Sequence, residues 1–109
     1  MKRCTSFLII SVLAFTACTG GHYFRKNNDT LSIFLKVSDA RQVYFLSSLE
    51  GYRPQEAMRV DERTWQISVP AQVEFKYFYK IDGKVYLPNC RLKEQDDFGS
   101  QNCIYLPDL

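Results

Sequence analysis

Short segments in which apolar and polar residues alternate constrain the fold of this chain more than any other feature. In segment 64–69, Trp65, Ile67 and Val69 lie on one side and polar residues on the other. A period of two residues is typical of a β-strand with one buried face. No window of about 11 residues in the body of the chain shows a helical stripe. The sequence therefore predicts an all-β domain.

Turn-forming residues separate about seven such segments, a number typical of an immunoglobulin-like β-sandwich. We expect strands at residues 30–37, 42–47, 57–60, 64–69, 73–81, 84–87 and 102–106. The Asp82–Gly83 pair, placed between two alternating segments, predicts a two-residue type I′ hairpin turn.

The strand predicted at 73–81 divides its side chains between two faces. Its Val73 face also carries Phe75, Tyr77, Tyr79 and Ile81, so we expect Tyr77 and Tyr79 in the core, together with Trp65. The opposite face carries Glu74, Lys76, Phe78 and Lys80.

The N-terminus has the pattern of an export signal. Lys2 and Arg3 precede an uncharged apolar stretch at residues 7–17. This stretch is shorter than the roughly 20 apolar residues of a membrane span and is typical of a signal peptide. We therefore assign residues 1–17 to a signal peptide.

Residues 15–18 resemble the lipobox of bacterial lipoproteins, whose cysteine becomes the lipidated first residue. The resemblance implies lipidation of Cys18 and a membrane-anchored protein of the bacterial cell envelope, facing the periplasm or the exterior. Phe15 stands where leucine is usual, and an ordinary secretory signal is the alternative. The polar residues that follow Cys18 predict a flexible tether over residues 18–28 and leave residues 29–109 as the folded domain.

Cysteine usage predicts one disulfide. Cys4 leaves with the signal and Cys18 is taken by lipid, so Cys90 and Cys103 remain as an even pair in an oxidising compartment. A metal site at this pair lacks further ligands, because His22 is the only histidine and lies near the anchor. A disulfide across this short loop is worth about 3 kcal/mol.

Length and charge exclude other classes of protein. A chain of 109 residues has room for one small domain. Its net charge of +2 comes from Lys2 and Arg3 in the signal, which leaves a neutral body. A neutral body argues against binding to nucleic acid.

Several segments together resemble the glycogen-binding carbohydrate modules of the AMP-activated protein kinase β subunit and of the N-terminus of isoamylases and branching enzymes. The resemblance covers roughly residues 31–107 and implies an immunoglobulin-like E-set domain. It rests on the order and spacing of segments 40–46, 51–52, 58–61, 64–70, 75–83 and 97–102.

The resemblance also implies a carbohydrate site. Tyr52 matches a tryptophan that stacks on glucose, Phe98 matches a leucine that inserts into the helical glucan, and Asn102 matches an asparagine that bonds sugar hydroxyls. Aromatic plates cover the apolar face of a pyranose, while polar side chains hold its rim of hydroxyls.

Two positions depart from the family pattern. Phe78 replaces a sugar-contacting lysine, and Val85 replaces a second stacking tryptophan, with Tyr86 beside it. The candidate carbohydrate-binding residues are therefore Tyr52, Phe78, Tyr86, Phe98 and Asn102. The alternative role of Phe78 and Phe98 is packing against the sandwich, and Asn102 has the alternative of capping a turn.

Catalysis has little support in the sequence. His22 lacks a nucleophile partner, and the chain has no phosphate-binding glycine loop. Glu94, Asp96 and Asp97 do not have the spacing of a calcium loop, so we read them as a solvated turn. We expect no enzyme, no cofactor and no metal.

The sequence thus favours a lipid-anchored binding module for an α-glucan or another envelope polysaccharide. The alternative is a protein-interaction or structural lipoprotein that has kept the fold but no longer binds sugar. A third hypothesis is an adaptor that delivers a separate glycan-processing enzyme to its substrate.

Overall fold

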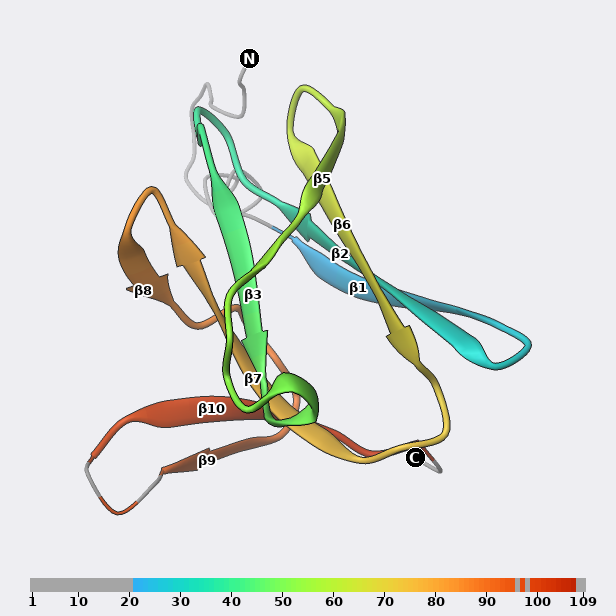
Figure 1. Ribbon diagram of the computed structural model, residues 1–109. Helices are drawn as coiled ribbons and strands as arrows, with labels where there is room; N and C mark the ends of the chain where they lie inside the picture. Colours follow the sequence, from blue (N-terminus) through green and yellow to red (C-terminus); the bar gives the residue numbers. More distant parts are fainter. Residues whose placement is uncertain (1–20, 96, 98, 108–109) are drawn as a thin grey trace, which may run out of the picture.

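The protein is a two-layer β-sandwich of immunoglobulin type in the computed structural model, which describes residues 21–95, 97 and 99–107 (Figure 1). The expected signal peptide, the lipidation site Cys18 and Phe98 lie outside the described residues. All strand pairs in the described part are antiparallel, which confirms the expected all-β class. Within these ranges no helix has the length and hydropathy needed to cross a membrane.

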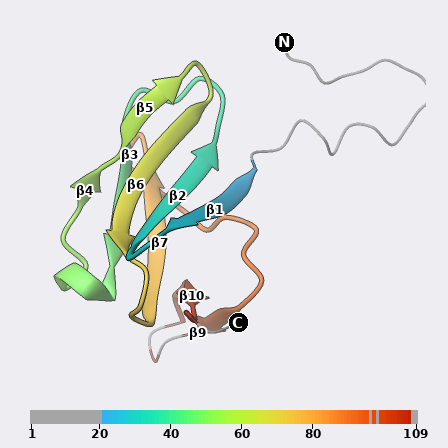
Figure 2. The same cartoon turned by 90° about the vertical axis from the view of Figure 1, so that its right-hand side faces the viewer.

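One sheet has four strands in the order β1-β2-β6-β5. They are β1 (His22–Asn27), β2 (Thr30–Lys36), β6 (Thr64–Pro70) and β5 (Met58–Asp61). Figure 2 shows β1 at the outer edge of this sheet.

The second sheet has six strands, five of them in the order β4-β3-β7-β10-β9, and β8 also pairs with β7. They are β4 (Gln55–Glu56), β3 (Val43–Ser47), β7 (Phe75–Ile81), β10 (Gln101–Tyr105), β9 (Lys93–Gln95) and β8 (Lys84–Tyr86), with the short 3-10 helix η2 (Ser48–Glu50) after β3. β8 pairs with the C-terminal half of β7 and β10 with its N-terminal half, so β8 and β10 follow one another along this strand.

Alternation on β7 decides which side chains form the core. Phe75, Tyr77 and Tyr79 are buried between the sheets, and Trp65 of β6 is buried with them, which confirms the expected core positions. Val73 was expected on the same face but is exposed, because the chain joins the ladder only at Phe75.

The two-residue hairpin between β7 and β8 confirms the predicted turn. Asp82 and Gly83 both have positive φ, at 50° and 85°, as a type I′ turn requires. One carboxylate oxygen of Asp82 accepts hydrogen bonds from the backbone N–H groups of Arg41 at 2.9 Å and Gln42 at 2.8 Å. Asp82 therefore also anchors the segment that enters β3.

The expected tether over residues 18–28 is wrong in its second half. Residues 22–27 form β1, which pairs with β2 along its whole length. Ring contacts stabilise this strand, among them Tyr23 stacked on Phe34 with centroids 4.8 Å apart and Phe24 against Tyr105 at 5.5 Å. The polar residues around these aromatics conceal the strand in the sequence.

Two more strands were also missed. β9 lies in the expected long loop, and β4 lies in the expected loop before the strand at 57–60. Each has two or three residues without an apolar side chain and gains its extended form by pairing, β9 with β10 and β4 with β3. Strands of two or three polar residues are too short to show a side-chain period in the sequence.

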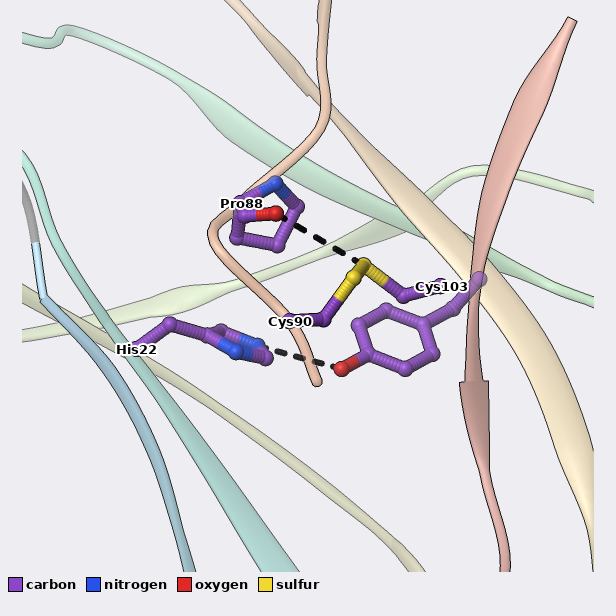
Figure 3. The surroundings of a disulfide bond; sticks show 5 residues. His22, Pro88, Cys90 and Cys103 are labelled. Carbon is purple, nitrogen blue, oxygen red and sulfur yellow. Dashed lines mark hydrogen bonds between the residues drawn. A yellow bond between two sulfur atoms is a disulfide. The ribbon is translucent and has the colours of Figure 1, made fainter. Parts of the chain in front are cut away.

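The predicted disulfide between Cys90 and Cys103 is confirmed. Cys103 is fully buried on β10 opposite Tyr77, and Cys90 belongs to the connection between β8 and β9 (Figure 3). The backbone N–H of Ile104 also donates to the carbonyl of Leu92 at 2.9 Å. The bridge therefore holds this connection and the start of β9 against the second sheet.

Candidate functional site

The outer face of the six-stranded sheet carries an open groove of about 650 Å³, which we call the sheet groove. The groove runs over several elements that are distant in sequence. Its principal side chains are Tyr52 after η2, Lys76 and Phe78 on β7, Val85 on β8, Glu94 on β9 and Asn102 on β10. Lys76 and Phe78 reach this face because they alternate with the buried residues of β7.

The turn after β3 fixes the position of Tyr52. Gly51 and Tyr52 both have left-handed backbone conformations, with φ of 63° and 64°. For tyrosine this conformation is uncommon and costs about 1 kcal/mol or more. The backbone N–H of Tyr52 donates to the carbonyl of Ser47 at 2.8 Å, which holds the turn closed.

The same turn is tied to the neighbouring strand. The hydroxyl of Ser48 accepts a hydrogen bond from the backbone N–H of Lys76 at 3.0 Å. The hydroxyl of Ser47 caps η2 by accepting from the N–H of Leu49 at 3.3 Å. These bonds hold the turn that carries Tyr52 beside β7.

Tyr52 and Phe78 form an aromatic platform in the groove. Their ring centroids are 6.2 Å apart and their planes are inclined by 21°. For a sugar ring to fit between them, the two aromatic rings would have to be about 8 Å apart, the sum of two van der Waals contact distances. A sugar ring therefore does not fit between them, and a flat apolar ligand face would contact the exposed part of this pair, to which Tyr52 contributes a ring that is 39% exposed.

A polar rim surrounds the aromatic platform. The Lys76 ammonium lies 3.0 Å from the Glu94 carboxylate and joins β7 to β9. The hydrogen bond and charge of Glu94 raise the pKa of Lys76 and so favour its charged form. Asn102 lies deeper, with 6% of its surface exposed. The rim thus offers hydrogen-bond donors and acceptors together.

Three of the five predicted binding residues meet in the sheet groove: Tyr52, Phe78 and Asn102. Tyr86 does not, and its assignment is corrected. It pairs with Tyr79 and packs against the core, because β8 places its neighbour Val85 on the groove side. Val85 is 67% exposed there.

The rim contact between Lys76 and Glu94 was not foreseen. The sequence places Lys76 on the same face as Phe78, but nothing in it brings Glu94 to that face. Glu94 arrives through β9, which pairs with β10 so that Glu94 lies opposite Asn102. Three residues without an apolar pattern carry no sequence signal for this pairing.

Two ionisable side chains with shifted pKa values lie elsewhere, between the two sheets. Burial lowers the pKa of His22 to about 4 and raises that of Tyr77. The His22 ring nitrogen Nε2 is 3.4 Å from the Tyr77 hydroxyl, close to the disulfide (Figure 3). In the described ranges, no three histidine, cysteine or acidic side chains gather as they would around a metal ion.

Comparison with known proteins adds no assignment. No protein-family model matches the chain, and no curated protein matches it significantly.

Proposed function

We propose that this chain is a non-catalytic, lipid-anchored module of the bacterial cell envelope that binds a neutral polysaccharide, with an α-glucan as the first candidate. The observation that carries the proposal is the Tyr52–Phe78 platform inside the sheet groove. The lipobox-like residues 15–18 support the anchor, and the resemblance to glycogen-binding modules supports the ligand.

The chemistry of the groove suits an uncharged sugar chain. The platform covers the apolar C–H face of a pyranose, while Lys76, Glu94 and Asn102 bond hydroxyl groups at its rim. Lys76 and Glu94 balance each other, and Asp97 adds a negative charge. An anionic polysaccharide would gain no favourable charge in this groove.

Affinity electrophoresis in native gels that contain glycogen, amylopectin or peptidoglycan fragments tests the proposal. We expect glycogen to retard the protein and Tyr52→Ala to abolish most of the retardation. Tyr23→Ala is a matched control, because Tyr23 and Tyr52 are both 39% exposed and each stacks on a phenylalanine, Phe34 or Phe78.

Only the loss of Tyr52 removes the groove platform, so Tyr23→Ala should migrate like the original protein. Equal retardation of both variants would show that sugar binds elsewhere. No retardation by any of these polysaccharides would reject carbohydrate binding.

A protein-interaction module is the second candidate, and Val85 favours it. This exposed aliphatic side chain in the sheet groove suits a protein surface better than a sugar ring. Crosslinking in the envelope followed by mass spectrometry separates the two functions. A reproducible protein partner at the groove, without polysaccharide retention, would favour this second function.

A further inference from the structure

The strand β1 ends the four-stranded sheet, and in the described residues only β2 pairs with it. The carbonyl of Gly21, just before β1, accepts a hydrogen bond from the N–H of Lys36 at 2.8 Å. Gly21 and Lys36 are therefore a hydrogen-bonded pair of the ladder. Because such pairs alternate along antiparallel strands, every second residue counted from Gly21 bonds to β2.

The intervening residues His22, Phe24 and Lys26 therefore direct their backbone N–H and C=O groups toward the free edge. Their side chains lie on the sandwich side of the sheet, since Phe24 pairs with the buried Ile33. A strand edge with free donors and acceptors is a template for one more strand.

A partly apolar pocket runs beside this free edge. It has a volume of about 330 Å³, and we call it the edge groove. His22 and Phe24 line one side, and Tyr105 of β10 and the connection at residues 89–92 line the other. Figure 2 shows this connection, which lies between β8 and β9, passing alongside β1. The groove is therefore placed to receive alternate side chains of an added strand.

The charges around the edge groove select the partner. Among the described residues its lining includes Arg91 and no carboxylate, and Lys26 lies two residues beyond Phe24 on the same face. Neither cation belongs to an ion pair in the described part of the chain. Two exposed, uncompensated cations favour a partner that carries acidic side chains.

We propose that β1 is a docking edge for an extended acidic segment of a partner polypeptide. The segment adds to β1 as a fifth strand of this sheet. Its backbone forms hydrogen bonds with the free N–H and C=O groups of His22, Phe24 and Lys26, and its alternate apolar side chains enter the edge groove. This surface belongs to the edge of the four-stranded sheet, away from the sheet groove, and does not depend on carbohydrate binding.

Amide NMR of the ¹⁵N-labelled protein in mild detergent tests the docking edge. The probe is a synthetic peptide of about nine residues in which aspartate alternates with valine. We expect it to shift the amide resonances of His22, Phe24 and Lys26 and to slow their hydrogen exchange. A peptide with lysine in place of each aspartate should bind at least about tenfold more weakly.

Charge reversal sharpens the test. Lys26 and Arg91 are exposed, so the variant Lys26→Glu with Arg91→Glu keeps the fold. It should prefer the lysine peptide by a similar factor. Equal affinity for both peptides, or no shift in β1 with either, would overturn the proposal. Slow exchange of β1 without peptide, dependent on protein concentration, would also overturn it and would identify pairing between two copies.

Discussion

The ring of Tyr52 lies 6.2 Å from the ring of Phe78, with their planes inclined by 21°. The two residues are distant in sequence, and the hydrogen bond from the Lys76 N–H to the Ser48 hydroxyl brings their elements together. Both rings line the sheet groove, and Val85 lines the same groove as an exposed aliphatic side chain.

A second aromatic plate should strengthen sugar binding. Val85 is exposed in the sheet groove, so Val85→Trp adds a ring without disturbing the core. One additional stacking contact of about 1 kcal/mol corresponds to about fivefold in affinity. Affinity electrophoresis in glycogen measures the effect. Val85→Ala is the control and should leave the retardation by glycogen unchanged. If Val85→Trp also leaves the retardation unchanged, the sugar does not bind over β8.

Removal of the disulfide should destabilise the domain. The Cys90–Cys103 bridge spans 13 residues, and a loop of this length is worth about 3 kcal/mol. The double variant Cys90→Ala with Cys103→Ala should therefore unfold at lower urea concentration than the oxidised protein. Reductant should lower the stability of the original protein and leave the variant unaffected. Identical urea midpoints for the oxidised protein and the variant would contradict a stabilising role.

Stability should fall as the pH drops from about 6.5 to about 4. Burial lowers the pKa of His22 to about 4, whereas an unfolded histidine titrates near 6.5. Between these pH values His22 is protonated in the unfolded chain and neutral in the folded chain. The free energy of unfolding therefore rises with pH. The full difference is roughly 3 kcal/mol.

Urea unfolding at several pH values measures this dependence. His22→Phe keeps a ring against Phe24 and Tyr77 but cannot be protonated. The variant should lose the histidine part of the pH dependence and retain the part due to carboxyl groups. Parallel curves for the two proteins would show that His22 is not buried in the folded state.

The hydroxyl of Tyr79 is buried without a hydrogen-bond partner in the described part of the structure. Tyr79→Phe removes this polar atom and keeps the ring, so we expect a gain of about 1 kcal/mol in unfolding free energy. Tyr77→Phe is the matched control, because it loses the contact of its hydroxyl with His22 and should give no gain. Thermal unfolding compares the two, and a lower Tm for Tyr79→Phe would refute the expectation.

Much of the fold was predictable because its signals are local. Alternation along β6 and β7 identified the buried faces, and Asp82 with Gly83 identified the hairpin. β1 escaped prediction because its two aromatic residues stand among polar ones and are stabilised by partners elsewhere in the chain. Interactions between distant segments are absent from any short window of sequence.

The candidate site was predictable only in part. Tyr52, Phe78 and Asn102 do share one groove, but Tyr86 faces the core because the β7–β8 register pairs it with Tyr79. A shift of one residue in register exchanges the two faces of a strand. Because a two-residue turn fixes the register of a hairpin, the predicted turn at Asp82–Gly83 already implied that Tyr86 lies opposite the core residue Tyr79.

The sequence by itself determined the all-β class, the hairpin at Asp82–Gly83, the buried face of β7 and the pairing of Cys90 with Cys103. Only the tertiary structure decided that Glu94 reaches Lys76, that Tyr52 lies over Phe78 and that β1 borders the edge groove. The physical reason is the distance along the chain over which the deciding interactions act. Side-chain period and turn conformation depend on neighbours in the chain, whereas grooves depend on strand pairing and sheet packing between distant segments.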